Sequence, residues 1–562
     1  MSAIARHRFR LRTAGSTFIL SLVAMAAVTI GVVTPASATS YVPLNGEGSS
    51  WSFGAINQWD QAVESDGMQI NYTPNGSTQG RQDFIDGQTD FAASDIPFQT
   101  DPTDGVSAVE HPKAGSYAYM PITAGGTVFM YNLMIDGQRV TNLRLSGANI
   151  AKIFTGAITN WDDPALAADN PGLQLPDQTI VPVVRSDGSG TSFELSQWMI
   201  SQEPSSWNAY CAKVGRAPNC GASSFYPTVT GMIAQNGDQG VANYVAANYA
   251  QGAIGYVNYY YALQLHFPVV QMLNAAGYYT EPTPQNVAVS LLQDQVDTTD
   301  VNNPALYLTQ QLSGVYTDPD PRTYPLSSYG YLILPTTVGN SFTTAKGATL
   351  AAYSYYAMCQ GQSEVSSLGY SPMPINLVQA AFDQIRKIPG AVVQNINIQQ
   401  CNNPTFTSTG VNLLAQTAPY PPACDKQGPT QCTNGTGGAV AISTAVSRGA
   451  SAGGGATASA GTSTGGSATG GSDSATATSA SGSGAAAAAS SSDESCDPST
   501  GACGSSSVGA YSVNPTAATV TLGAGSGWSS TQTLLALIGL ALLTLLLVPG
   551  LLTRRLERRR SP

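Results

Sequence analysis

The sequence predicts an α/β fold for the segment from about Tyr41 to Cys432. Short runs that favour strands alternate there with stretches that have helical patterns, which is typical of mostly parallel sheets covered by helices. Several of the strand-like runs end in a turn rich in Gly and Ser that opens a helix. The segment is long enough for two units of ordinary size, each with its own core.

The expected elements follow one another along the chain. A Gly-Ser-Thr turn precedes the first of the helices, and a Gly pair interrupts the longest apolar run. The predicted elements are strands at 68–72, 89–93 and 180–184, helices at 79–86 and 191–199, and an apolar run at 119–133.

The N-terminus, residues 1–38, has the features of a secretory signal peptide. Four arginines between positions 6 and 12 precede an apolar run at 18–33. Ala36-Ser37-Ala38 then supplies the small residues after which a signal peptidase cuts the chain. The protein is therefore expected to be exported.

The C-terminal part is expected to form a linker and a membrane anchor. Residues 433–530 are almost entirely Ser, Gly, Ala and Thr, and this composition predicts a flexible linker without a packed core. An apolar stretch at 534–552 has the length of a transmembrane helix, and the tail at 553–562 is rich in arginine. Basic flanks stay in the cytoplasm, so the folded segment is expected outside the cell as a single-pass membrane protein.

Charge and cysteine content exclude some functions. The formal net charge is −11 and both ends of the chain are basic, so the segment between them is more acidic still. Such a segment is not expected to bind nucleic acid. The eight cysteines suit an oxidising environment, and their order suggests the local pairs Cys211–Cys220, Cys359–Cys401, Cys424–Cys432 and Cys496–Cys503. With three histidines and no Cys-x-x-Cys, no metal and no cofactor are expected.

The strongest motif runs from Pro182 to Phe193, where a buried strand ends in Arg-Ser-Asp-Gly-Ser-Gly-Thr-Ser and opens a helix. The free N–H groups of a helix start form an anion site without net charge. Arg185 supplies a planar group that suits an oxyanion, and Asp187 is expected to hold that group in place. The motif also fits an ordinary turn between a strand and a helix.

Three further motifs share this character. Gly46–Trp51 and Asn75–Gly80 each precede a helical pattern, and Ala92–Pro97 places Asp95 at the end of a strand. Each alone fits an ordinary cap or turn. Together they suggest that several helix starts point at one anion.

These motifs resemble those of the phosphate-binding proteins of bacterial ABC phosphate transporters, in the order in which that family has them. The resemblance extends over most of 41–395, including Asn236–Ala242 and Gly252–Val257, but is poor over 263–321. It implies a two-lobed, periplasmic-binding-protein-like fold of type II with two hinge crossings. Lobe 1 would comprise 41–122 and 327–432, and lobe 2 would comprise 123–326.

The resemblance also implies roles for individual residues around one phosphate. Asp95 would accept a hydrogen bond from a protonated phosphate oxygen, which sulfate lacks near neutral pH. Arg185 would donate to the ligand while paired with Asp187. The remaining expected donors come from three helix starts: Ser50 and Trp51, Ser77, and Ser189, Gly190 and Thr191.

The function that follows is extracellular capture of inorganic phosphate for delivery to an ABC importer, with permease subunits as possible partners. An alternative is a membrane-anchored surface, sensory or adhesive protein that keeps the fold. An enzyme is not expected, because no pair of a nucleophile and a histidine is visible. The sequence does not distinguish phosphate from arsenate.

Overall fold

The computed structural model describes residues 41–218, 220–401, 403–407, 410–436 and 441–443. Within these ranges, no helix combines the length and the apolar character that crossing a membrane requires. The signal peptide, the transmembrane helix, the cytoplasmic tail and nearly all of the linker that the sequence predicts lie outside the described residues.

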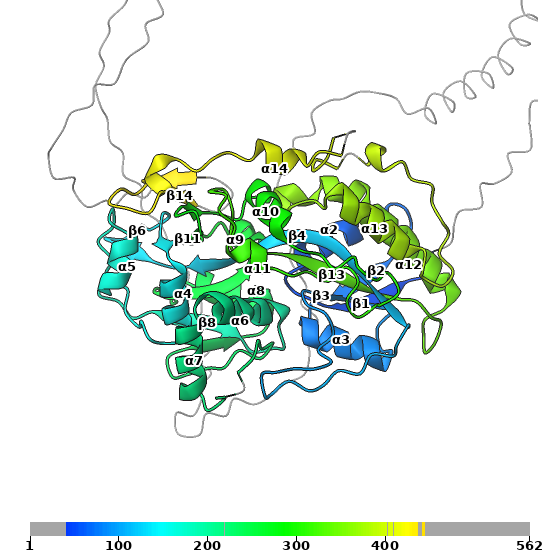
Figure 1. Ribbon diagram of the computed structural model, residues 1–562, viewed down its shortest axis with the longest axis horizontal. Coiled ribbons are helices and arrows are strands. Elements are labelled where there is room, and N and C mark those ends of the chain that lie inside the picture. The colour runs from blue at the N-terminus through cyan, green and yellow to red at the C-terminus, as the bar shows by residue number, and fades with distance from the viewer. Residues whose placement is uncertain (1–40, 219, 402, 408–409, 437–440, 444–562) are drawn as a thin grey trace, which may run out of the picture. The chain divides into compact units, whose positions relative to one another are not determined.

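An eight-stranded sheet in the order β2-β1-β3-β13-β4-β10-β8-β9 forms the centre of this region (Figure 1). We call β2, β1 and β3 the first half of the sheet and β10, β8 and β9 the second half; β4 and β13 lie between them. The strands are β1 (Leu44–Gly48), β2 (Ile70–Thr73), β3 (Phe91–Ser94), β4 (Tyr117–Tyr131), β8 (Val181–Arg185), β9 (Ile233–Gln235), β10 (Ala253–Asn258) and β13 (Ser327–Pro335).

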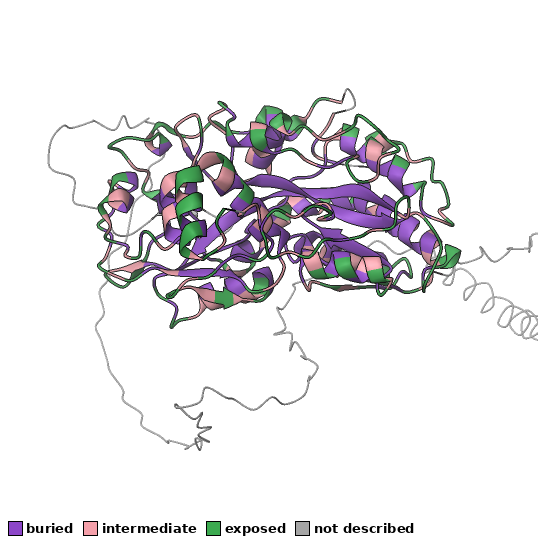
Figure 2. Ribbon diagram, turned by 60° about the horizontal axis from the view of Figure 1, so that its bottom comes forward, coloured by how far each residue is buried: buried purple, intermediate pink, exposed green. Residues whose placement is uncertain are grey.

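The two long strands β4 and β13 connect the halves. They pair antiparallel from Ser327 opposite Gly126 to Pro335 opposite Tyr117, with a register shift between Gly330 and Tyr331. Every residue of both strands is buried, and Figure 2 shows the sheet as a buried layer between half-exposed helices. A continuous apolar run is typical of strands that are covered on both faces.

The sequence predicts a mostly parallel sheet, and this holds only for the outer strands. The pairs β1–β2, β1–β3, β8–β10 and β8–β9 are parallel. The central pairs are antiparallel, because β4 and β13 run in opposite directions past each other and past their neighbours. The strands expected at 68–72, 89–93 and 180–184 are confirmed as β2, β3 and β8, each shifted by one or two residues.

Helices cover both faces of the sheet (Figure 1). In α2, Ile56, Trp59 and Val63 lie at spacings of three and four residues and bury one face, as expected for a surface helix. The α-helices are α2 (Phe53–Glu64), α3 (Ser77–Asp86), α4 (Gly147–Phe154), α5 (Pro164–Asp169), α6 (Gly190–Gln202), α7 (Pro204–Lys213), α8 (Gly237–Ala246), α9 (Tyr259–Leu265), α10 (Pro284–Ser290), α11 (Ser313–Tyr316), α12 (Thr344–Met358), α13 (Ile375–Ile385) and α14 (Leu413–Thr417).

Shorter elements complete the described region. The 3-10 helices are η1 (Leu291–Gln293), η2 (Gln360–Ser363), η3 (Val365–Leu368), η4 (Ile398–Gln400) and η5 (Ala423–Asp425). Three small sheets contain β5 (Met134–Ile135) with β6 (Gln138–Arg139), β7 (Arg144–Leu145) with β11 (Gln271–Leu273) and β12 (Tyr279–Thr280), and β14 (Asn434–Thr436) with β15 (Ala441–Ser443).

Three of the four suggested disulfides are confirmed: Cys211–Cys220, Cys359–Cys401 and Cys424–Cys432. The fourth, Cys496–Cys503, lies outside the described residues. The second of these bridges ties residue 401 to the end of α12. The third closes a small loop just before β14.

Residues 403–407 and 410–436, which we call the C-terminal strap, run from the α13 side of the molecule to the second half of the sheet (Figure 1). Near α13, Asn403 and Thr405 bond the carbonyls of Met373 and Pro372. Further on, α14 packs against α10. The strap therefore spans both sides of the structure.

The far end of the strap is anchored by buried polar groups. Arg144 of β7 donates to the carbonyls of Cys424 at 2.9 Å and Thr430 at 3.1 Å. Gln431 donates to the carbonyl of Asn142 at 2.7 Å. These bonds satisfy groups that burial would otherwise leave unpaired.

The strap also changes the expected start of the linker. The sequence predicts a flexible linker from residue 433, but 434–436 and 441–443 form the antiparallel pair β14–β15. A Cβ at Gly435 would collide with the backbone of Thr141 and Asn142, so the absence of a side chain lets this strand lie close to the second half. Composition alone does not reveal this contact.

Candidate functional site

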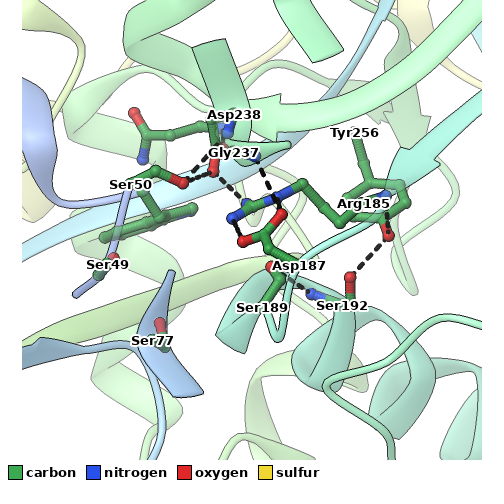
Figure 3. Close-up of polar contacts among 12 residues, drawn as sticks. Ser49, Ser50, Ser77, Arg185, Asp187, Ser189, Ser192, Gly237, Asp238 and Tyr256 are labelled. Atoms are coloured by element: carbon green, nitrogen blue, oxygen red, sulfur yellow. Dashed lines mark hydrogen bonds and ion pairs between the residues drawn. The ribbon is translucent and has the colours of Figure 1, made fainter. Parts of the chain in front are cut away.

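Three helix starts and one strand end converge between the two halves of the sheet. The first start is the segment 49–51 between β1 and α2, and the second is Gly76–Ser77, where α3 begins. The third is Ser189–Thr191 at the start of α6, in the second half. Figure 3 shows the serines of the three starts, Ser49 and Ser50, Ser77, and Ser189, together with Arg185.

The segment 49–51 is held by three tyrosines. The hydroxyl groups of Tyr72, Tyr261 and Tyr370 donate to the carbonyls of residues 49, 50 and 51 at 2.8, 2.7 and 2.7 Å. In a trans peptide the N–H points away from the carbonyl. The N–H groups of residues 50 and 51 are therefore aimed away from these tyrosines.

Trp51 contributes to the site through its backbone. Its indole is 1% exposed, and its Nε1 donates to Thr127 Oγ1 of β4 at 3.1 Å. The ring packs edge-on against Tyr370. The indole is thus part of the core beneath β4, and this packing fixes the start of α2.

Asp95 follows β3 and is 1% exposed. Its carboxylate accepts from the hydroxyl groups of Ser49 and of Ser77, the latter at 3.1 Å. Burial raises the pKa of Asp95 to about 6, although the Ser49 hydrogen bond lowers it, and nearby Asp238 raises it further. Each carboxylate oxygen has two acceptor sites, so Asp95 keeps capacity for a further donor.

Arg185 ends β8 and is bonded to two carboxylates (Figure 3). Its Nε donates to Asp187 Oδ1 at 2.8 Å and its Nη2 to Asp187 Oδ2, as the sequence predicts for this pair. Its Nη1 donates to Asp238 at the start of α8. A guanidinium has five N–H groups, so two remain for a ligand after these three bonds.

The start of α6 approaches Asp95 and Ser77 very closely. A Cβ on Gly190 would lie 2.6 Å from Asp95 Oδ2 and 2.9 Å from Ser77 Oγ. Glycine therefore permits the second half to approach the first here. Thr78 N donates to the carbonyl of Gly188 at 3.0 Å across the same boundary.

Donors remain open at this helix start. Ser189 Oγ caps α6 by accepting from Ser192 N at 3.2 Å, which leaves its own hydrogen for another acceptor. Thr191 Oγ1 is buried and has no hydrogen-bond partner among the described residues. The N–H groups of residues 190 and 191 lie in the first turn of α6, where a helix offers no carbonyl. This set of unpaired donors suits an anion.

The structure brings together all the residues that the sequence singles out: Ser50, Trp51, Ser77, Asp95, Arg185, Asp187, Ser189, Gly190 and Thr191. The sequence reasoning missed Ser49, Asp238 and the three tyrosines. The motif Asn-Gly-Asp-Gln-Gly at 236–240, where α8 begins, is also a polar helix start, and this signal points to Asp238. No group of three or more His, Cys, Asp or Glu arranged for a metal occurs in the described part of the chain.

Comparisons with known proteins agree with this architecture. A family model described as the PBP superfamily domain matches residues 33–360. The phosphate-binding protein PstS of Xylella fastidiosa strain Temecula1 is 32% identical over 351 residues, which are 62% of this chain and 86% of the relative. PstS of Haemophilus influenzae is 29% identical over 358 residues, which are 64% of this chain and 96% of the relative.

The solved structures that match this chain include two phosphate-binding proteins. A periplasmic phosphate-binding protein, PfluDING, bound with phosphate has a TM-score of 0.47 and 16% identity, and the match covers 63% of this chain and 100% of that one. The phosphate-binding protein of Stenotrophomonas maltophilia has a TM-score of 0.46 and 18% identity, and its match covers 66% of this chain and 99% of that one.

Proposed function

Because this chain belongs to the PBP superfamily and, within it, to the PstS phosphate-binding proteins, we propose that it captures inorganic phosphate between the two halves of its sheet for an ABC importer. The observation that carries the proposal is the convergence of three helix starts, Arg185 and Asp95 on one point. Helix starts and a guanidinium group stabilise an oxyanion, and a buried carboxylate selects one that carries a proton. The role proposed is binding, not catalysis.

The proposed contacts divide between the halves. The first half supplies Ser50, the N–H of Trp51, Ser77 and Asp95. The second half supplies the two open N–H groups of Arg185 and the start of α6 at Ser189, Gly190 and Thr191. Asp187 holds Arg185 in position through two hydrogen bonds.

We propose further that the halves are the cores of two lobes that close on the ligand. Lobe 1 comprises 41–122 and the chain from 327 to about 400, and lobe 2 comprises 123–326. The crossings are β4 and β13, and the register shift at Gly330 is a suitable place for a hinge. The C-terminal strap, which the sequence assigns to lobe 1, makes its last contacts with lobe 2.

We also propose export and anchoring. Three disulfides in the described region fit an oxidising compartment. Cleavage after residue 38, a linker beyond β15 and a membrane helix at 534–552 would leave the binding domain outside the cell, close to permease subunits. Protease treatment of intact cells should degrade the binding domain, whereas a protected domain would contradict this topology.

Asp95→Asn should relax the choice between phosphate and sulfate. The wild-type carboxylate accepts the phosphate O–H, whereas sulfate near neutral pH would leave the buried carboxylate facing a like charge. An amide can donate to sulfate, so we expect the preference for phosphate in the variant to fall on the order of tenfold or more. Calorimetric titration of the full chain with each anion measures this preference.

The matched control is Asp104→Asn. Asp104 is also buried and also accepts from two serine hydroxyls, those of Ser107 and Ser223, but it lies outside the helix starts. Asp104→Asn should leave the preference for phosphate over sulfate unchanged. If Asp95→Asn also keeps the wild-type preference, Asp95 does not select the ligand.

Tyr261→Phe should weaken phosphate binding although the side chain does not touch the ligand. Loss of its hydroxyl leaves the buried carbonyl of Ser50 with the long bond from Phe53 N, at 3.4 Å, and costs about 1 kcal/mol in stability. The peptide that carries the Trp51 N–H also loses its orientation, so we expect affinity to fall by about fivefold. Tyr324→Phe removes an equivalent bond, at 2.8 Å to the Thr127 carbonyl. Tyr324→Phe should reduce stability without changing phosphate affinity. Equal losses of affinity in the two variants would contradict the proposed role of Tyr261.

A further inference from the structure

Asp238 is a buried carboxylate at the proposed phosphate site that the expected set of ligand contacts does not include. It is 0% exposed and lies in the first turn of α8, in the second half of the sheet. Its Oδ1 accepts from Asn258 N at 2.7 Å, and its Oδ2 accepts from Arg185 Nη1. The same Oδ2 also accepts from Ser50 Oγ at 2.6 Å, across the boundary between the halves (Figure 3).

This bond decides what the Ser50 hydroxyl can offer a ligand. A hydroxyl has one hydrogen and two lone pairs. The hydrogen is donated to Asp238 Oδ2, and one lone pair accepts from Asp238 N at 3.1 Å. One lone pair remains, so Ser50 Oγ can accept from a ligand but cannot donate to it.

Asp238 also changes the charge of the site. The positive charge of Arg185 is already balanced by Asp187, and Asp238 adds a second carboxylate to the same guanidinium. Asp95 brings a third carboxylate to the site, so the charge of one guanidinium group is set against those of three carboxylates. These carboxylates repel a doubly charged anion more strongly than a singly charged one.

We propose that Asp238 determines the protonation state of the captured ligand, so that the site takes monobasic phosphate, H2PO4−, in preference to the dibasic form. This inference rests on the proposed phosphate function. Monobasic phosphate has two O–H donors, and the site presents two acceptors, the Asp95 carboxylate and Ser50 Oγ. Its two remaining oxygens face the helix starts and the open N–H groups of Arg185.

The other groups that face Asp238 do not change charge in the relevant pH range. Burial raises the pKa of Tyr261 on α9 and of Tyr370 before α13, so both phenols stay neutral. Burial alone would raise the pKa of Asp187, but the Arg185 guanidinium brings it below its usual value. Asp95, with a pKa of about 6, is ionised at higher pH. Above that pH, the second ionisation of phosphate is therefore the change that matters.

The test starts with the wild-type full chain and inorganic phosphate. Free phosphate at about pH 8.5 is mainly dibasic, so capture of the monobasic form should take up about one proton per phosphate. Calorimetry in buffers of different ionisation enthalpy counts this proton. The affinity should also fall about tenfold for each pH unit once free phosphate is mainly dibasic. Phosphorus NMR of the bound ligand should give the monobasic chemical shift throughout.

The comparison is with Asp238→Asn, which keeps the shape of the side chain and an acceptor for Asn258 N but removes the charge. Proton uptake should fall towards zero, and the decline of affinity with pH should flatten. At about pH 8.5 the variant should bind phosphate about tenfold more tightly than the wild type. Asp60→Asn is the matched control, because Asp60 on α2 has a pKa raised by burial to about 7 and bonds Tyr353 instead of the site. Asp60→Asn should show the same decline of phosphate affinity with pH as the wild type.

Each outcome separates the inference from the proposed function. Phosphate binding by the wild type without proton uptake, or a slope that Asp238→Asn leaves intact, overturns the inference alone. If Asp238→Asn does not fold, the proton count and the NMR shift of the wild type still show whether the site captures the monobasic form. Absence of phosphate binding at every pH overturns the proposed function and this inference with it.

Discussion

Arg185→Met should abolish phosphate binding and also destabilise the fold. The methionine fills part of the same space but leaves the carboxylates of Asp187 and Asp238 without their shared cation. Removing one partner of a buried ion pair costs about 3–5 kcal/mol, because a charge is left buried and uncompensated. Urea denaturation followed by circular dichroism gives the loss of stability, and calorimetry gives the loss of binding.

Arg322→Met is the matched control for this experiment. Arg322 bonds Asp320 through Nε and Nη2, two residues away in the chain, with the same fork geometry as Arg185 and Asp187. Its side chain is 13% exposed and that of Asp320 is 27% exposed, so solvent screens the pair. Its Nη1 also donates to the carbonyls of Ala415 at 3.1 Å and Ala418 at 3.4 Å in the C-terminal strap, so we expect a loss of about 1–2 kcal/mol, smaller than for Arg185→Met, and unchanged phosphate binding. Similar losses in the two variants would mean that burial at the site is not what makes Arg185 important.

Gly190→Ala should reduce phosphate affinity by about a hundredfold or more. The new methyl group would lie 2.6 Å from Asp95 Oδ2 and 2.8 Å from Asp95 Cβ, well inside van der Waals contact. Asp95 and Ser77 belong to the first half, so the start of α6 would have to withdraw from them. A displacement of about 1 Å at such a site can cost a hundredfold in function.

The control for this glycine is Gly240→Ala on α8. A Cβ there meets its nearest neighbour, Gln235 Cβ, at 3.5 Å, which is ordinary contact. Alanine favours a helix over glycine by about 1 kcal/mol, so this variant should be equally or more stable and should bind phosphate normally. Normal binding by Gly190→Ala would show that the observed approach of α6 to Asp95 is not needed in the complex.

Much of the site could be predicted from the sequence, because local signals specify it. Ser50, Ser77 and Ser189 each lie at the junction of a strand-like run and a helical pattern, and such junctions place polar groups at the same edge of a sheet. The structure confirms the strands, the helix starts and the pairing of Arg185 with Asp187. The three described disulfides were also suggested by the order of the cysteines.

The residues that were missed depend on contacts between distant parts of the chain. Asp238 is separated from Ser50 by 188 positions, and no local pattern links them. Tyr370 likewise reaches the carbonyl of Trp51 from 319 positions away. The antiparallel centre of the sheet was missed for a similar reason, because strand direction follows from the path of the chain between the halves and not from composition.

The C-terminal strap has a mechanical consequence for a protein whose chain continues beyond it. The last described residues, 441–443, pair with β14, and this end is fixed to the second half by Arg144, Gln431 and the Cys424–Cys432 bridge. A force applied to the chain from the C-terminal side therefore acts on the periphery of the second half, away from β4 and β13. With the membrane anchor proposed above, such a force would act on the second half and would leave the crossing strands free for the proposed closure.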